Sequence, residues 1–380
     1  MAASTVMKHK YKELDALRWL AAFSVGMGHA FLCVLVNGRL PKLPHVLGTM
    51  IFNGAYAVDL FFVLSGFVLI NATKSLGVLP YLGFLARRAL RIYPAAWMSL
   101  SVAAIALLFA RSVSANHGLW VSPWIDSLLG APALSLLNLI GILVLSNYAV
   151  NTTLWTIAIE LAASAAYPFF VPLVRSRKIA IAICLTIGAL GASNYIAGGM
   201  ALRHVGHYLY MFMAGACLNF LRPLEAFKWR NYVIFAAIGL MCCARLYGQR
   251  HQFVSDSISV ASAAILIASI AFWCPPWLER FLSGRVLGNL GSASYSYYLI
   301  NPSVTFALVK CAQALPIHGP SSSIQYFAYC LALGTVASVI TTPLSLASAK
   351  YIESASINLG RAVEKRIVGE RREILNLPIP

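Results

Sequence analysis

Long runs of apolar residues, separated by short polar stretches, set the pattern of this chain. A transmembrane helix needs about 20 consecutive, mostly apolar residues. Strands of a membrane barrel would instead alternate apolar and polar positions over about ten residues, whereas the apolar runs here are continuous. The pattern therefore predicts transmembrane helices. Ten runs have the required length: 14–36, 51–73, 92–111, 152–174, 179–198, 203–221, 231–248, 256–274, 293–312 and 324–347.

A further apolar stretch, residues 131–148, is short for a membrane crossing and carries Pro132 near its start. We expect it to dip into the membrane from a long loop, and an eleventh transmembrane helix is the alternative. The basic residues favour the first interpretation, because an odd number of crossings would place the later basic loops on the outer side.

The composition supports a membrane protein. The chain of 380 residues is 59% hydrophobic and only 11% charged, with a mean hydropathy of +0.75. Soluble domains are about 45–50% apolar and about 25% charged. This excludes a soluble enzyme, a disordered chain and a collagen-like fibre. The predicted fold class is all-α: a polytopic integral membrane protein with about ten transmembrane helices.

The few charges are mostly positive, with 29 Lys and Arg against 12 Asp and Glu and a net charge of +17. In a soluble protein this excess would suggest nucleic acid as a partner, but in a membrane protein basic residues gather in cytoplasmic loops. We therefore expect the chain to be embedded in a lipid bilayer and not to bind nucleic acid. Both termini should lie in the cytoplasm. With ten crossings, the basic residues fall on the cytoplasmic side except Arg39, Lys42, Arg111, Arg203, Arg245, Arg250 and Lys310.

Two regions are expected: a transmembrane domain, residues 1–348, and a basic cytoplasmic tail, residues 349–380. In the tail, Leu359, Val363 and Ile367 recur every four residues among basic side chains. This spacing suits a helix that lies on an anionic membrane surface. A solvated charged tail is the alternative.

Ionisable residues inside a bilayer are costly and are functional candidates by default. The predicted spans contain His29, Asp59 and Glu160 away from their ends, and Arg18 one turn into the first span. At 1.5 Å per residue, His29 lies about 22 Å from the cytoplasmic end, and both carboxylates lie about 12 Å from the outer ends. These three groups could share one polar cavity in which His29 moves protons. Ion pairs that only hold helices together are the alternative.

A second cluster precedes the third span and contains Arg87, Arg88, Arg91 and Tyr93. Guanidinium groups bind phosphate with two hydrogen bonds, which lysine does not. Arg88 and Arg91 would share one face of a helix. The cluster therefore indicates a binding site for phosphate groups, with a plain topology signal as the alternative.

Several blocks of the sequence resemble the membrane-bound acyltransferase family 3. The first block has an arginine and a histidine separated by ten residues, as Arg18 and His29 are. The late block departs from the family, which often has a histidine where this chain has Asn301. The five similar blocks are Glu13–Arg18 with His29, Ala57–Phe67, Arg88–Pro94, Trp155–Glu160 with Tyr167 and Pro168, and Ser294–Leu299.

This resemblance implies transfer of an acyl group, usually acetyl, from cytoplasmic acyl-CoA to a hydroxyl group of a carbohydrate or glycolipid at the bacterial inner membrane. It implies that His29 is the general base, that Arg18 holds the donor or pairs with Asp15, and that Asp59 or Glu160 orients His29. The coenzyme A moiety would be bound by three residues, Arg88, Arg91 and Tyr93. No metal is expected.

Two other functions stay open at this point. The acceptor could be a small secondary metabolite such as a macrolide. A proton-coupled transporter also places carboxylates and histidine inside the membrane. Transporters commonly consist of two matched halves with broken helices, and we find no such halves in this sequence.

Overall fold

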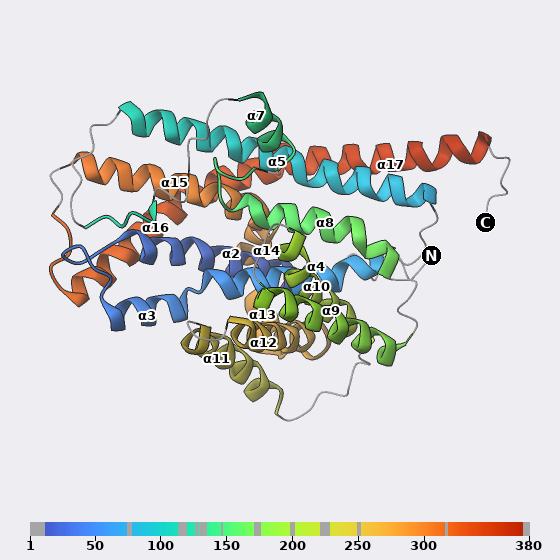
Figure 1. Cartoon of the computed structure of the whole chain (residues 1–380), viewed down its shortest axis with the longest axis horizontal. Helices are drawn as coiled ribbons and strands as arrows, with labels where there is room; N and C mark the ends of the chain where they lie inside the picture. Colours follow the sequence, from blue (N-terminus) through green and yellow to red (C-terminus); the bar gives the residue numbers. More distant parts are fainter. Residues whose placement is uncertain are drawn as a thin grey trace. The chain divides into compact units, whose positions relative to one another are not determined.

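The computed structural model describes residues 12–73, 78–112, 120–125, 129, 135–145, 147–170, 176–197, 202–220, 229–248, 252–315 and 318–374. These residues are helical, apart from turns, connecting loops and two isolated β-bridges. No strand occurs among them, which confirms the predicted all-α class (Figure 1).

Sixteen helical elements occur in the described residues. They are α2 Lys12–Cys33, α3 Lys42–Ile51, α4 Gly54–Thr73, α5 Val78–Ser112, α7 Leu136–Leu143, α8 Leu154–Phe170, α9 Arg177–Ala197, α10 Leu202–Leu218, α11 Arg230–Gly248, α12 Gln252–Trp273, α13 Pro276–Leu282, α14 Arg285–Ser292, α15 Ser294–Ala314, α16 Ser323–Ser348, the π-helical turn η2 Ala349–Glu353, and α17 Ser354–Ile374.

Each of the ten apolar runs overlaps one of these helices over most of its length, so their helical character is confirmed. The ends of several runs, such as 171–174, lie outside the described residues. Ten crossings and cytoplasmic termini remain predictions. Five described stretches are long and apolar enough to cross a membrane by length and composition: Lys12–Cys33, Lys42–Ile70, Pro80–Ser112, Phe253–Trp273 and Ser323–Val368.

Helix α7 is the described part of the ambiguous stretch 131–148, of which 131–134 and residue 146 lie outside the described residues. It has eight residues and therefore extends about 12 Å at 1.5 Å per residue. The hydrocarbon core of a bilayer is about 30 Å thick. This length agrees with a segment that dips into the membrane and not with an eleventh spanning helix.

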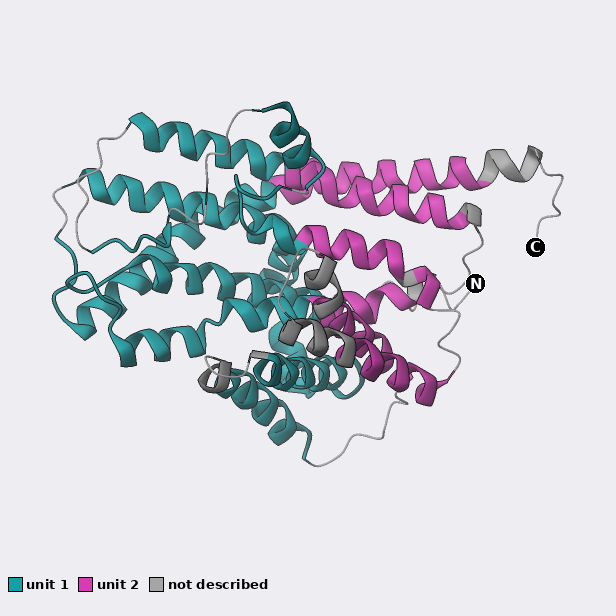
Figure 2. Ribbon diagram, viewed as in Figure 1, with its two compact units in different colours: residues 1–61, 97–156, 223–347 teal, residues 62–96, 157–222, 348–380 magenta. Residues whose placement is uncertain are grey.

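The chain forms two compact units (Figure 2). The first unit contains residues 1–61, 97–156 and 223–347, and the second contains residues 62–96, 157–222 and 348–380. The basic tail, described as far as Ile374, thus belongs to the second unit together with parts of the predicted transmembrane region.

Helix α2 is the central element of the first unit, where it contacts α3, α12, α13, α14 and α15. Small residues let membrane helices approach closely, and α2 uses two glycines for this purpose. A β-carbon on Gly26 would lie 2.8 Å from the side chain of Asn301, and one on Gly28 would lie 2.6 Å from the carbonyl oxygen of Phe52. The narrow faces of α2 therefore fix the positions of α15 and of the turn after α3.

A tight turn reverses the chain after α2. Asn37 and Gly38 have positive φ angles of 47° and 77°, and Val36 pairs with Arg39 on either side of them. Asn-Gly is the pair of residues that such a two-residue turn prefers. The turn leads into α3, a helix that precedes the second predicted run and was not predicted.

In the second unit, α17 packs antiparallel against the first half of α5. A β-carbon on Gly83 would lie 3.2 Å from Glu364, and one on Gly360 would lie 3.2 Å from the backbone of Arg87. Arg87 also forms a 2.8 Å ion pair with Glu364. The tail forms the helix α17, as one of the two alternatives predicted, and it contacts α5 as well as the preceding turn η2. Its binding to a membrane surface remains a prediction.

Helix α5 begins at Val78, well before the predicted start of the third span at residue 92. Residues 78–91 are too polar to be read as a membrane span, so the apolar pattern did not mark them as a helix. Packing against α17 stabilises these residues as a helix, and a hydropathy pattern cannot predict such a contact. Arg88 and Arg91 consequently lie on a helix, as the argument from their spacing requires.

The crossing of α4 and α10 in the second unit gives a test of the fold. Side chains at Gly66 or Gly215 would overlap the backbone of Phe212 or Val63. We expect Gly66→Ala and Gly215→Ala each to destabilise the protein by about 1–3 kcal/mol, seen as a lower melting temperature in detergent.

Gly239→Ala is the control for this test, because nothing lies within 4 Å of a β-carbon on Gly239. It should be neutral or stabilising by up to about 1 kcal/mol, since alanine favours helix more than glycine does. Equal melting temperatures in all three variants would contradict the close crossing of α4 and α10.

Candidate functional site

The predicted site residues divide between the two units. Arg18, His29 and Asp59 belong to the first unit, which contains residues 1–61. The second unit contains the remaining four predicted residues: Arg88, Arg91, Tyr93 and Glu160.

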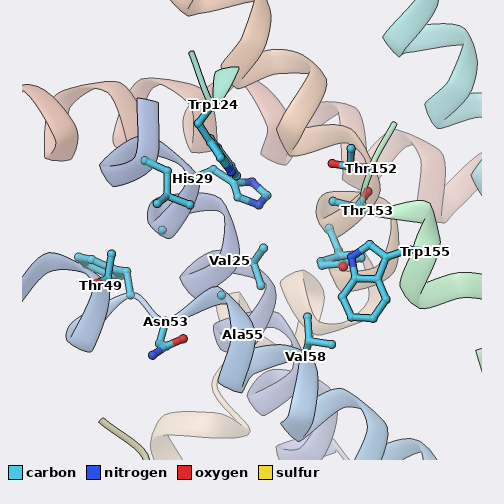
Figure 3. A pocket seen from close by; sticks show the side chains of 15 residues that line it. Val25, His29, Thr49, Asn53, Ala55, Val58, Trp124, Thr152, Thr153 and Trp155 are labelled. Atoms are coloured by element: carbon cyan, nitrogen blue, oxygen red, sulfur yellow. The ribbon is translucent and has the colours of Figure 1, made fainter. Parts of the chain in front are cut away.

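His29 faces a cavity of about 270 Å³ in the first unit. Figure 3 shows its ring extending from α2 into this pocket, with Trp155 and Thr153 across from it. The Nδ1 atom of His29 is buried and has no hydrogen-bond partner among the described residues. The orientation of His29 by Asp59 or Glu160 stays a prediction.

The indole ring of Trp124 lies beside the imidazole ring of His29. The two ring centroids are 5.6 Å apart and the ring planes are tilted by 41°. Trp124 follows α5 in a connecting segment and carries no motif that identifies it. Its position became evident only from the structure.

Backbone hydrogen bonds hold the segment of Trp124 against the end of α2. The Leu35 amide donates to Trp120 at 2.6 Å, and the Ser122 amide donates to Cys33 at 2.8 Å. The Ser122 hydroxyl then accepts from the Trp124 amide at 3.2 Å. These bonds fix the distance between Trp124 and the helix that carries His29.

Asn151 organises another wall of the pocket. Its side chain is fully buried and donates from Nδ2 to the carbonyl oxygen of Leu299 at 2.9 Å. Its Oδ1 atom accepts from the hydroxyl of Thr153 at 2.7 Å and from the Thr153 amide at 3.2 Å. Asn151 thereby places Thr153 at the start of α8 against α15.

Asp59 is buried on α4, with 4% of its surface exposed. Asp256 and Ser259 on α12 lie near its carboxyl group, whose Oδ2 atom has no hydrogen-bond partner among the described residues. One turn earlier on α4, the Tyr56 hydroxyl lies 2.5 Å from that of Ser255. These contacts form a polar seam between α4 and α12 and fit a role in helix packing. The proposed action of Asp59 on His29 remains a prediction.

Arg18 forms an ion pair with Asp15 at 3.0 Å, which is one of the two alternatives that the sequence left open. Both residues lie on α2, three positions apart. The Arg18 side chain is 22% exposed and the Asp15 side chain 51%. Since Arg18 and His29 are eleven residues apart on one helix, they are separated by about 16 Å along its axis.

The arginine cluster and Glu160 come together in the second unit. Arg88 lies 3.5 Å from Glu160 and donates from Nε to the Ser164 hydroxyl at 3.2 Å. Only 12% of the Arg88 side chain is exposed, while Arg91 on the same helix is exposed and Tyr93 is half-buried. Glu160 thus contacts a predicted phosphate-binding residue.

Asn301 occupies the position where a histidine was expected from the resemblance. It is buried on α15, donates to the Tyr297 hydroxyl at 3.4 Å and accepts from the Thr305 hydroxyl at 3.4 Å. Tyr297 in turn lies 2.7 Å from the hydroxyl of Ser338 on α16. Asn301 therefore joins a polar network between helices and packs against Gly26 of α2.

Comparisons with known proteins agree with the motifs. A family model described as an acyltransferase domain matches residues 11–342. The chain is also similar to a protein named acyltransferase MdmB from Streptomyces mycarofaciens. The two are 25% identical over 317 residues, which cover 76% of this chain and 77% of the relative. No solved structure matches the chain.

Asn151 allows a test of how the pocket is built. Asn151→Ala removes the hydrogen bonds to Leu299 and Thr153 and leaves their buried groups unpaired. Each such loss costs about 1–3 kcal/mol, so the melting temperature in detergent should fall clearly. Asn289→Ala, at an exposed position on α14, is the control and should melt like the wild type. A variant at Asn151 that melts unchanged would contradict this role.

Proposed function

The chain belongs to acyltransferase family 3, and we propose that it moves an acetyl group from cytoplasmic acetyl-CoA to a hydroxyl group of a carbohydrate acceptor. Acyl transfer itself follows from the family model that covers residues 11–342. The observation that carries the proposal is the imidazole of His29, which opens into a cavity inside a bundle of apolar helices.

The donor half of the proposal rests on the second unit. Coenzyme A presents phosphate groups, and arginine binds phosphate with paired, charge-assisted hydrogen bonds. Arg91 is exposed at the surface of α5 and is accessible to such a group. Arg88 already binds one anion, the carboxylate of Glu160. This contact supports a role of Glu160 on the donor side, where it balances the charge of Arg88.

The chemical step needs one base and no external redox partner. His29 accepts the proton of the acceptor hydroxyl, and the oxygen attacks the carbonyl carbon of the thioester. The carbon–sulfur bond breaks, an ester forms on the acceptor, and the thiolate of coenzyme A leaves. The imidazolium of His29 then returns the proton to the thiolate. A covalent acetyl-histidine is the less favoured variant.

We place this reaction at the bacterial inner membrane, with both termini in the cytoplasm and a glycan of the cell envelope, a lipopolysaccharide or an oligosaccharide signal as acceptor. The charge distribution supports this orientation. Mass spectrometry of envelope glycans and glycolipids, from cells with and without the gene, tests the acceptor class. Loss of acetyl groups from a glycan is the expected result, and unchanged acetylation of all glycans would refute it.

His29→Ala provides the first test of the chemistry. Because the side chain lines the pocket without hydrogen bonds from Nδ1, its removal should leave folding and the binding of acetyl-CoA intact. Transfer to the acceptor should fall by at least about 100-fold, the lower end of what a general base contributes. Binding is measured by calorimetry and transfer with radiolabelled acetyl-CoA. Turnover at the wild-type rate would exclude His29 as the base.

The double variant Arg88→Ala and Arg91→Ala tests the donor site. A hydrogen bond to a charged group is worth about 1.5–3 kcal/mol, so Arg91→Ala alone should weaken binding of acetyl-CoA about tenfold or more. The double variant should abolish it. Arg111→Ala changes an exposed arginine near the other end of α5 and should bind normally. Unchanged binding in the double variant would rule out this donor site.

A further inference from the structure

The pocket around His29 has aromatic walls that the proposed chemistry does not use. Trp124 and Trp155 both line it, and they come from separate segments of the chain. In Figure 3 the Trp124 ring lies beside His29, and Trp155 lies on the opposite side of the pocket near Thr152 and Thr153. Indole rings are large and rigid and bind the apolar faces of ligands.

One polar side chain that lines this pocket, Asn53, lacks a hydrogen-bond partner for one of its atoms. Asn53 lines the cavity, and its Oδ1 atom accepts from the Tyr56 amide at 3.3 Å. Its Nδ2 atom is buried and has no hydrogen-bond partner among the described residues. A buried donor without a partner costs about 1–3 kcal/mol. A ligand oxygen in the cavity would remove that cost once the Asn53 side chain turns Nδ2 toward it.

The volume limits what can enter. Pockets for drug-sized ligands measure roughly 300–1,000 Å³, and this cavity of about 270 Å³ is smaller. It has room for one sugar ring beside His29, and the rest of a larger acceptor would lie outside.

We infer that Trp124, Trp155 and Asn53 form a subsite for a single pyranose ring, the one that carries the acetylated hydroxyl group. The inference rests on the proposed function and makes it more specific. The indoles cover the carbon–hydrogen faces of the ring, and Asn53, with its amide turned toward the cavity, donates from Nδ2 to one of the oxygens of the sugar. His29 then meets a hydroxyl at the rim of the ring. The two tryptophans and Asn53 bind the acceptor and take no part in proton transfer.

The anchoring of Trp124 supports this assignment. Three hydrogen bonds along the segment 120–124 tie its backbone to the end of α2 and to Ser122, so the backbone that carries the indole is fixed before a ligand arrives. A preorganised side chain loses little conformational entropy on binding. This rigidity suits a residue that selects the shape of the acceptor.

The test uses purified full-length protein in detergent, acetyl-CoA as donor, and methyl hexopyranosides as acceptor probes. Open-chain hexitols serve as matched probes, because they offer similar hydroxyl groups without a ring. Some of the pyranosides should be acetylated and the hexitols at least tenfold less efficiently. Equal transfer to rings and open chains, or no transfer to any pyranoside, would overturn the inference.

Variants then assign the effect to residues. Trp124→Ala should raise the KM for the pyranoside at least tenfold and leave the KM for acetyl-CoA unchanged, and Trp124→Phe should restore most of the loss. Asn53→Ala should raise the same KM by a smaller factor. Trp277→Ala, at an exposed position on α13, is the control.

Two outcomes separate this inference from the proposed function. A Trp124→Ala variant with an unchanged KM for the pyranoside, or with only kcat reduced, would overturn the subsite while the acyl-CoA donor stands. Failure of the wild-type protein to bind acetyl-CoA would instead refute the proposed donor. Calorimetry with acetyl-CoA alone distinguishes these two cases.

Discussion

Close packing around α2 is the constraint on which the rest of the first unit depends. Inside a lipid bilayer, helices gain little from the hydrophobic effect, because the lipid chains are as apolar as the side chains. Contact between helices must therefore come from shape. Gly26 and Gly28 leave no room for a β-carbon against Asn301 and Phe52. His29 follows Gly28 on the same helix, so these close contacts also determine the position of His29.

Charge is the second constraint, since an isolated ion inside a membrane is expensive. Charged side chains lower this cost by forming ion pairs: Arg18 pairs with Asp15, and Arg88 pairs with Glu160. The imidazole of His29 differs from these groups, because its buried Nδ1 atom has no hydrogen bond among the described residues. An aromatic neighbour, Trp124, packs against it instead. Each unit thus contains an ion pair, and the first unit also contains a base whose Nδ1 atom has no hydrogen bond among the described residues.

Hydropathy was enough to predict a helix in each of the ten long apolar runs, because runs of about 20 apolar residues have few other uses, but it did not predict the short helices α3, α13 and α14. The motifs led to His29 and the arginines. The pairing of Glu160 with Arg88 was not predictable, since their separation in the sequence says nothing of which helix faces meet. Trp124 was also missed, because backbone hydrogen bonds position it and leave no residue pattern. The start of α5 was not predicted for a related reason. It packs against α17, which lies at the other end of the chain.

The hydrogen-bond network around Asn301 affects how the packing of the helices responds to low pH. Amides and the hydroxyls of serine and threonine do not gain or lose protons across the biological pH range, and tyrosine does so only near pH 10. The hydrogen bonds that join Asn301, Tyr297, Thr305 and Ser338 are therefore the same in an acidified and a neutral medium. A histidine in the same place would add a charge on acidification, between helices that have no room to hydrate it. With asparagine, the contact between α2 and α15 is insulated from the acidity of the surroundings.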